Sequence, residues 1–202
     1  MWFVRIQSTN SAKDNYYKNM TSLKQTFEKD TVTKVQEKLG IKNPMAAPRL
    51  KKIVVNASTK DFLTDKKNLE KAREDLISIT GQMPKTARAR ISVSTFKLRE
   101  GDQIGLVVTL RGNRMYDFFE KLVKIVLPRV KDFNGISAKA FDGRGNLSIG
   151  FSENTVFSEI DPGKVDKIRS LQITLVTDAG DDKKGRVLFE EMGVPFKKQE
   201  NN

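Results

Sequence analysis

The stretch "IGLVVTLRG" at residues 104–112 decides the fold, together with "RMYDFFEKLVKIVLP" at residues 114–128, one residue further on. The first is a nearly continuous apolar run rich in β-branched residues, which predicts a strand well inside a sheet. The second has a wide apolar face at helical spacing, and we expect Pro128 to stop this helix. That face consists of Met115, Phe118, Phe119, Leu122, Val123 and Val126. A buried strand and an amphipathic helix therefore follow one another in the chain.

The same patterns predict further elements on both sides of this pair. Helices are expected over residues 14–39, 66–79 and 181–192, each with a glycine suited to a helix C-cap at its end. Strands are expected at residues 51–56, 85–99, 147–151 and 170–177. These elements lack the regular alternation of a doubly wound parallel sheet. We therefore predict an α+β fold, with one largely antiparallel sheet and helices packed on one face.

The composition limits the class of function. The chain has 202 residues and a net charge of +12, which favours an anionic partner: nucleic acid first, an anionic membrane surface second. It contains no cysteine and no histidine, so disulfides and thiolate zinc sites are excluded and the commonest general base is missing. Catalysis by carboxylates, lysine or bound magnesium stays open. No apolar run approaches the roughly 18 residues of a membrane span.

The positive charge is concentrated in two acid-free windows. Six bases and no acid lie between Glu37 and Asp61, and five bases and no acid lie between Asp75 and Glu100. If the two windows fold side by side, they form one basic surface. Phe96 is the only aromatic residue in these windows that we expect to be exposed. Proteins that bind single strands stack bases on exposed aromatics, so we expect recognition of the backbone and shape of a folded RNA instead.

Individual polar residues give weaker signals. Asn56 is expected at the end of its strand, Gln82 just past a helix end, and Thr109 inside an apolar strand. For each, an ordinary structural role is more common than ligand binding. The basic stretch "KTARARISVSTFKLREG", residues 85–101, is explained equally well by a charge-protected edge strand and by contact with nucleic acid.

The segment "FDGRGN", residues 141–146, suggests a phosphate site, because glycines flank Asp142 and Arg144. It matches neither the P-loop nor the dinucleotide-binding pattern. We expect a structured turn in which Asp142 bonds the backbone and Arg144 is exposed. A magnesium-dependent phosphate-handling enzyme built on these two residues is the alternative function, but the sequence offers no second carboxylate at a telling spacing. A membrane-binding role is disfavoured, because helix 66–79 carries acids on its polar face.

Five long motifs then occur in a fixed order over about residues 16–198. They are "NPMAAPRLKKIVVN", "ITGQMPKTARARISVSTFKLREGDQIGLVVTLRGNRMYDFFEKL", "LPRVKDFNGISAKAFDGRGN", "FSEIDPGKVDKIRSLQITLVT" and "GVPFKK". In these motifs the sequence resembles the bacterial-type ribosomal protein L5 family of the large subunit. The resemblance implies a single α+β domain over 16–198, between an N-terminal extension (1–15, expected to be flexible) and a short tail (199–202).

The resemblance also implies a non-enzymatic role, with no catalytic residue, metal or cofactor, and three sets of contact residues. Binding of 5S rRNA in the central protuberance is implied for Lys51, Lys52, Asn56, Gln82, Lys85, Thr109 and Arg111. A loop over residues 86–98 is implied to face the elbow of the peptidyl-site tRNA, through Arg88, Arg90, Ser92, Ser94 and Lys97. An intersubunit bridge to the small-subunit head, with protein S13 as partner, is implied for Asp142, Arg144 and Asn146.

Further implications concern surroundings and departures from the family. Large-subunit rRNA and other central-protuberance proteins are expected neighbours, whereas no membrane partner and no homo-oligomer are expected. The expected location is the bacterial cytoplasm, with an organellar ribosome as the lesser alternative. Two departures bear on RNA contacts: "ASTKDF" (residues 57–62) lacks the usual glycine, and Met83 replaces a usual lysine.

Overall fold

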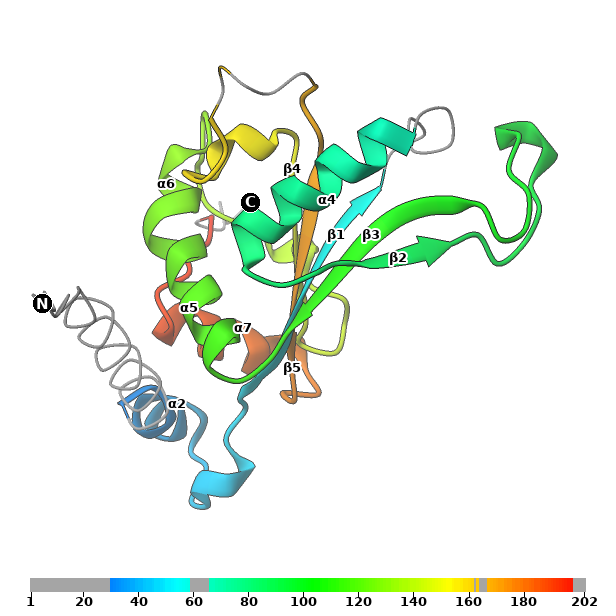
Figure 1. Cartoon of the computed structure of the whole chain (residues 1–202). Coiled ribbons are helices and arrows are strands. Elements are labelled where there is room, and N and C mark those ends of the chain that lie inside the picture. Colours follow the sequence, from blue (N-terminus) through cyan, green and yellow to red (C-terminus); the bar gives the residue numbers. More distant parts are fainter. Residues whose placement is uncertain (1–29, 59–65, 162, 164–166, 198–202) are drawn as a thin grey trace, which may run out of the picture.

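The computed structural model describes residues 30–58, 66–161, 163 and 167–197 (Figure 1). The predictions for residues 1–15, for the first half of the helix over 14–39, for residues 59–62 and for the tail at 199–202 lie outside this range. None of the helices in the described part of the chain is long and apolar enough to cross a membrane.

A five-stranded sheet forms the centre of the molecule. Its strands are β1 (Leu50–Ser58), β2 (Lys85–Arg88), β3 (Gln103–Leu110), β4 (Leu147–Phe151) and β5 (Leu171–Thr177). They are ordered β2-β3-β1-β5-β4, and every neighbouring pair is antiparallel. The predicted antiparallel sheet is thereby confirmed. The apolar run in β3 also occupies an interior strand with two partners, although β1 is the middle strand.

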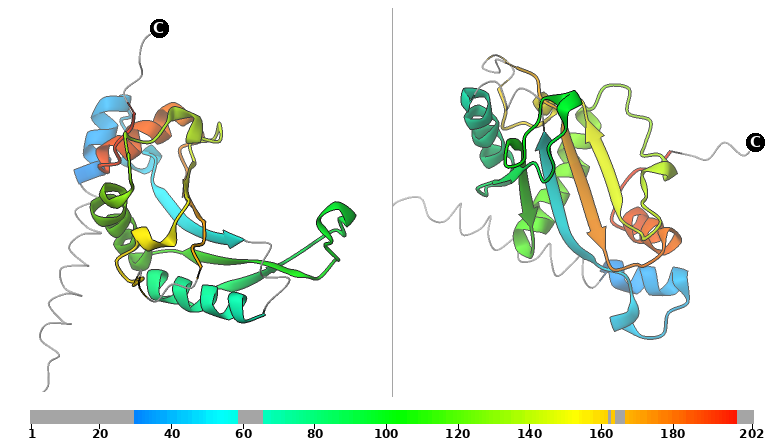
Figure 2. Two further views of the ribbon diagram at one scale, coloured as in Figure 1. Left: turned by 90° about the horizontal axis from the view of Figure 1, so that it is seen from above. Right: turned by 90° about the vertical axis from the view of Figure 1, so that its right-hand side faces the viewer.

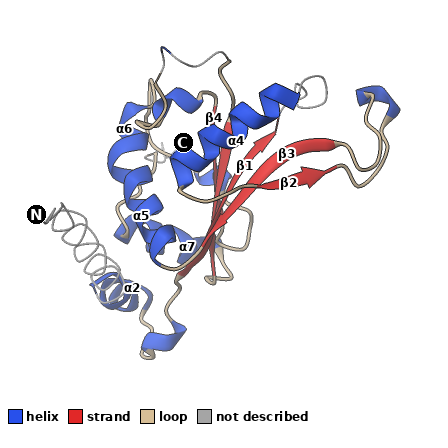
Figure 3. Cartoon of the chain, viewed as in Figure 1, coloured by secondary structure: helices blue, strands red, loops and turns tan. Residues whose placement is uncertain are grey.

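Helices cover one face of this sheet (Figures 2 and 3). They are α2 (Val32–Leu39), α4 (Lys66–Thr80), α5 (Asn113–Lys121), α6 (Leu127–Arg129) and α7 (Asp182–Glu191). The predicted C-cap glycines Gly40, Gly81 and Gly193 have φ angles of 64°, 65° and 87°, the left-handed conformation in which glycine has no Cβ penalty. The predicted α+β architecture is confirmed.

The helix after β3 departs from the prediction at its end. α5 continues through a π-helical turn (Leu122–Val126) into α6, so Pro128 does not stop the helix, which extends one residue further. The backbone N–H of Leu127 bonds the carbonyl of Leu122, five residues back. This wider turn precedes the proline, which has no N–H to donate.

The core lies between the helices and one face of the sheet. Ile53 and Val55 of β1 are fully buried and belong to one apolar cluster with Leu76 of α4 and Phe119 of α5. Because side chains alternate along a strand, the residues between them lie on the other face. The burial pattern of β1 alternates accordingly from Ile53 to Ala57.

The expected strand over residues 85–99 is wrong beyond Arg88. β2 ends there, and residues 89–102, which we call the hairpin loop, project away from the sheet (Figure 1). Its partner β3 begins only at Gln103, so no neighbouring strand of the described part pairs with residues beyond Arg88. The loop has its own hydrogen bonds: Ala89 N–H donates to the Asp102 carbonyl at 2.8 Å, and Gly101 N–H donates to the Ala89 carbonyl at 3.0 Å.

Candidate nucleic-acid interface

The face of the sheet turned away from the helices, here called the open face, collects polar side chains from all parts of the chain. The right-hand view of Figure 2 looks onto it, across β1, β5 and β4. Its residues alternate with the buried ones along each strand. They include Lys52, Val54, Asn56, Lys85, Val107, Thr109, Ser148, Gly150, Gln172, Thr174 and Val176.

Strand register places five of these residues in one row. Lys85 is opposite Val107, which is opposite Asn56, which is opposite Gln172, which is opposite Gly150. Residues directly opposite in antiparallel strands lie on the same face with their Cβ atoms about 5 Å apart. One row therefore crosses all five strands, with a lysine at one edge, an amide on the middle strand and a second amide on the strand beside the other edge.

The position predicted for Asn56 needs correction. It does not end its strand, because β1 continues to Ser58, and Asn56 is paired on both sides. An asparagine is tolerated there because its backbone is satisfied by the ladder while its half-buried side chain lies on the open face. The side chain therefore presents its amide from the middle of the sheet.

Thr109 lies next to this row. It is opposite Val54, which is in turn opposite Thr174 of β5. Lys52 lies on the same face, opposite Val176. The structure thus places Lys52, Asn56, Lys85 and Thr109 on one surface, although they come from three strands.

The remaining cations of the predicted 5S rRNA set flank that surface. Lys51 is exposed at the irregularity in register between Leu50 and Lys52, and the exposed Arg111 directly follows β3. Neither they nor Lys52 and Lys85 form an ion pair with another residue of the described segments. Their charges are therefore available to an anionic partner.

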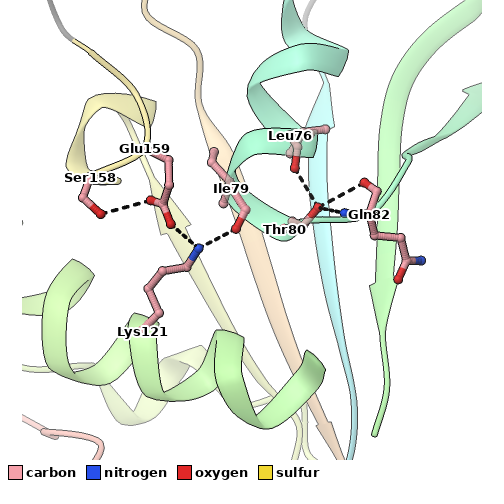
Figure 4. Close-up of polar contacts among 7 residues, drawn as sticks. All are labelled: Leu76, Ile79, Thr80, Gln82, Lys121, Ser158 and Glu159. Atoms are coloured by element: carbon pink, nitrogen blue, oxygen red, sulfur yellow. Dashed lines mark hydrogen bonds and ion pairs between the residues drawn. The ribbon is translucent and has the colours of Figure 1, made fainter. Parts of the chain in front are cut away.

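Gln82 lies just past the end of α4, and its side chain contacts β3. Its side-chain Nε2 donates to the Thr109 carbonyl at 3.2 Å, and its backbone N–H donates to the Thr80 hydroxyl. Figure 4 shows how this helix end is held: Lys121 of α5 donates to the Ile79 carbonyl and pairs with Glu159. A cation at the C-terminal carbonyls of a helix is favourable. Within the described segments the Gln82 side chain makes no other hydrogen bond, so its carbonyl oxygen is available to a partner.

The hairpin loop carries four of the five residues predicted to face tRNA, the fifth, Arg88, ends β2, and all five are exposed. The Ser92 hydroxyl accepts a hydrogen bond from the Glu100 N–H at 2.9 Å, so it also shapes the loop. Phe96 is 56% exposed, in agreement with the expectation that it is not a core residue. The loop thus presents cations together with one aromatic ring.

The segment at residues 141–146 forms the predicted structured turn. The Asp142 carboxylate accepts from the N–H groups of Arg144 at 2.9 Å and Asn146 at 3.1 Å, and Arg144 is exposed. Asn146 is directed inward, since its Oδ1 accepts from the Thr177 N–H at 2.9 Å. Sequence reasoning missed Asp182, whose carboxylate accepts from two N–H groups of the turn.

The Asp142 carboxyl should respond to pH. The hydrogen bond from the Asn146 side chain is the main influence that holds the pKa of Asp142 below its ordinary value of 3.8. A carboxyl with a lowered folded-state pKa stabilises the fold above its unfolded pKa, and this contribution is lost as the pH falls through the folded value. We expect that loss in the window below 3.8, and we expect Asn146→Ala to raise the pKa in an NMR titration. An unchanged pKa would show that backbone N–H groups alone set it.

The sequence prediction missed the open-face residues of β4 and β5. Gln172 and Thr174 alternate with buried residues in "SLQITLVT", and this period-two pattern was the available signal. Ser148 and Thr174 face each other, with their hydroxyl oxygens 3.1 Å apart. The polar surface is therefore wider than the predicted set.

The chain matches known protein families over most of its length. The family model described as ribosomal protein L5 matches residues 43–99, and the model for the C-terminus of the same ribosomal family matches residues 103–196. The large ribosomal subunit protein uL5 of Anaeromyxobacter sp. (strain K) is 49% identical over 175 residues, covering 87% of this chain and 97% of that protein. The protein of the same name from Desulforapulum autotrophicum is 49% identical over 178 residues, covering 88% and 99%.

Proposed function

We propose, from the premise that this chain belongs to the ribosomal protein L5 family and is a structural constituent of the large ribosomal subunit, that its open face binds 5S rRNA and anchors it in the central protuberance. The observation that carries this proposal is the row across the sheet that includes Lys85, Asn56 and Gln172, flanked by cations without an ion pair to any described residue. Large-subunit rRNA is the general partner that the family implies.

The physical account divides the residues into two kinds. Lys51, Lys52, Lys85 and Arg111 neutralise phosphates and release counterions, which supplies most of the affinity. Asn56, Gln82 and Thr109 donate and accept at fixed points of a rigid sheet and thereby set the register of the RNA. On an A-form helix these groups meet 2′-hydroxyls and minor-groove edges. The flat, paired backbone beneath them fixes their spacing before binding.

The two projecting segments suit further partners. The hairpin loop projects away from the sheet with Arg90 and Lys97 exposed, and the exposed Arg88 ends β2 at its base, an arrangement that suits contact with the peptidyl-site tRNA elbow. The turn at residues 141–146 lies beside the N-terminal end of α7, with Arg144 exposed for the bridge to small-subunit protein S13. The tRNA contact and the bridge to S13 are parts of the proposed function, but their residues are separate from the open-face site for 5S rRNA.

Single substitutions on the open face test the main proposal. Asn56→Ala or Thr109→Ala should weaken 5S rRNA binding by roughly 1–3 kcal/mol, the scale of losing a hydrogen bond and leaving its partner unsatisfied. Filter binding at fixed salt measures the effect. The Asn56 side chain makes no hydrogen bond within the described segments, so its loss should leave the fold intact. If both variants bind 5S rRNA with unchanged affinity, the assignment of the site is wrong.

Lys85→Ala provides a matched control from the same row. Removing one phosphate contact should reduce the slope of log affinity against log salt concentration by about 1, whereas removing the neutral Asn56 amide should leave the slope unchanged. Equal slopes in wild type and Lys85→Ala would place Lys85 outside the RNA contact.

A further inference from the structure

A hollow of about 450 Å³ opens at the end of the open face where β1, β5 and β4 lie side by side. Its lining includes Asn56, Gln172, Gly150, Ser152 and Ser170. Only the first of these belongs to the set of residues predicted for 5S rRNA. The volume lies in the lower part of the range of about 300–1,000 Å³ that small-ligand sites occupy, which suits one nucleoside-sized group.

The lining of the hollow is neutral, and it contains two side-chain amides on adjacent strands. Asn56 and Gln172 are directly opposite on adjacent strands, and each side-chain amide offers two donors and an acceptor. Within the described part of the chain neither amide has a hydrogen-bond partner. The Ser152 and Ser170 residues are exposed at the rim. No charged side chain of the described segments lines the hollow, which distinguishes it from the cation-assisted sites that bind phosphate.

Gly150 keeps the hollow open. It is opposite Gln172 in the register, and it does not have a left-handed φ. A Cβ added at this position would meet no atom within 4 Å. Glycine inside a strand weakens it, and here neither the backbone conformation nor crowding requires one. What the missing side chain provides is space beside the solvent-accessible amide of Gln172, in the same row as Asn56.

We infer that this hollow receives a single unstacked nucleotide, whose base edge or ribose hydroxyls bond the amides of Asn56 and Gln172. The inference rests on the proposed binding of 5S rRNA by the open face and names one subsite of that contact. Unpaired bases that leave the stack are the part of an RNA that presents donors and acceptors together. Lys85, at the opposite edge of the same row, supplies the charge for the neighbouring backbone.

Filling the hollow is the direct test. Gly150→Val adds a β-branched side chain that strands favour, and it should weaken 5S rRNA binding about tenfold, the scale of one or two net hydrogen bonds. Because no charge is removed, the salt slope should stay at its wild-type value. Chemical probing should show one nucleotide of 5S rRNA that wild type protects and Gly150→Val exposes, with the rest of the footprint unchanged. Gln172→Met, which keeps the length of the side chain and removes the amide, should expose the same nucleotide.

Ser148→Val is the matched control, since it introduces the same side chain on the same strand and face but outside the hollow. It also removes the hydroxyl contact with Thr174, but it should keep the protection of the one nucleotide that Gly150→Val exposes. Identical footprints for wild type and Gly150→Val, or loss of protection of that same nucleotide in both valine variants, would overturn the inference while leaving 5S rRNA binding in place. If the wild-type protein itself does not bind 5S rRNA, both the proposed function and the nucleotide subsite that rests on it are wrong.

Discussion

Replacing Gly145 by alanine is expected to lower the free energy of unfolding by about 2–5 kcal/mol, the sum of a left-handed backbone penalty and an overpacking penalty. Its φ is +81°, and an added Cβ would lie 2.8 Å from the Ala179 Cβ and 2.8 Å from the Asp181 carbonyl oxygen. Those atoms cannot retreat cheaply, because one is main chain and the other is attached directly to it. Urea unfolding monitored by circular dichroism measures the change.

Gly143→Ala is the control within the same turn. Its φ is +84°, but a Cβ there would meet nothing within 4 Å. It should therefore cost only the left-handed penalty of about 1–2 kcal/mol. The difference between the two variants isolates the cost of the steric clash with residues 179–181. Equal losses would mean that the turn accommodates the added methyl group at Gly145 without measurable cost.

Local patterns were sufficient to predict most of the fold. The β-branched composition of β1 and the helical spacing in α4 and α5 predicted the type of each element. Glycines at positions 40, 81 and 193 marked helix ends because their left-handed conformation is a local requirement. Such features depend on neighbours a few residues away, and a sequence displays them directly.

The errors arose where an element depends on a distant partner. Residues 89–99 have strand-like composition, but a strand needs a second strand to pair with, and β3 begins only at Gln103. Asn56 was placed at a strand end because asparagine disfavours strands, whereas pairing with both β3 and β5 extends β1 to Ser58. In both cases the non-local pairing outweighed the local preference.

The candidate site shows the same limit. The resemblance to the family named Asn56 and Lys85, but only the register of four strand pairs shows that they share a row with Gln172 and Gly150. Nothing local marks Gly150 as the residue that leaves a hollow. A glycine in a strand has several meanings, and its surroundings decide among them.

The ion pair between Arg169 and Asp75 provides the second large expected effect. Arg169 Nη1 lies 2.9 Å from Asp75 Oδ2, and the Arg169 side chain is only 7% exposed. The pair joins α4 to the segment that enters β5, directly before the residues that line the hollow. Asn154, which is 1% exposed, donates to the same carboxylate oxygen. The pair therefore stands at the junction between the helical layer and the open face.

Asp75→Ala should destabilise the protein by about 3 kcal/mol, because it leaves a buried guanidinium without its counter-charge. This is the low end of the usual range, since the Asp75 side chain keeps 27% of its exposure and water can partly replace it. The double variant Asp75→Ala/Arg169→Met should recover most of the loss. Burial raises the pKa of Asp75 despite the opposing effect of Arg169. The free-energy cost of desolvating the carboxylate therefore offsets much of its attraction to the guanidinium. Thermal unfolding of Asp75→Ala, Arg169→Met and the double variant forms a mutant cycle. A double variant no more stable than Asp75→Ala would show that the ion pair is a net source of stability.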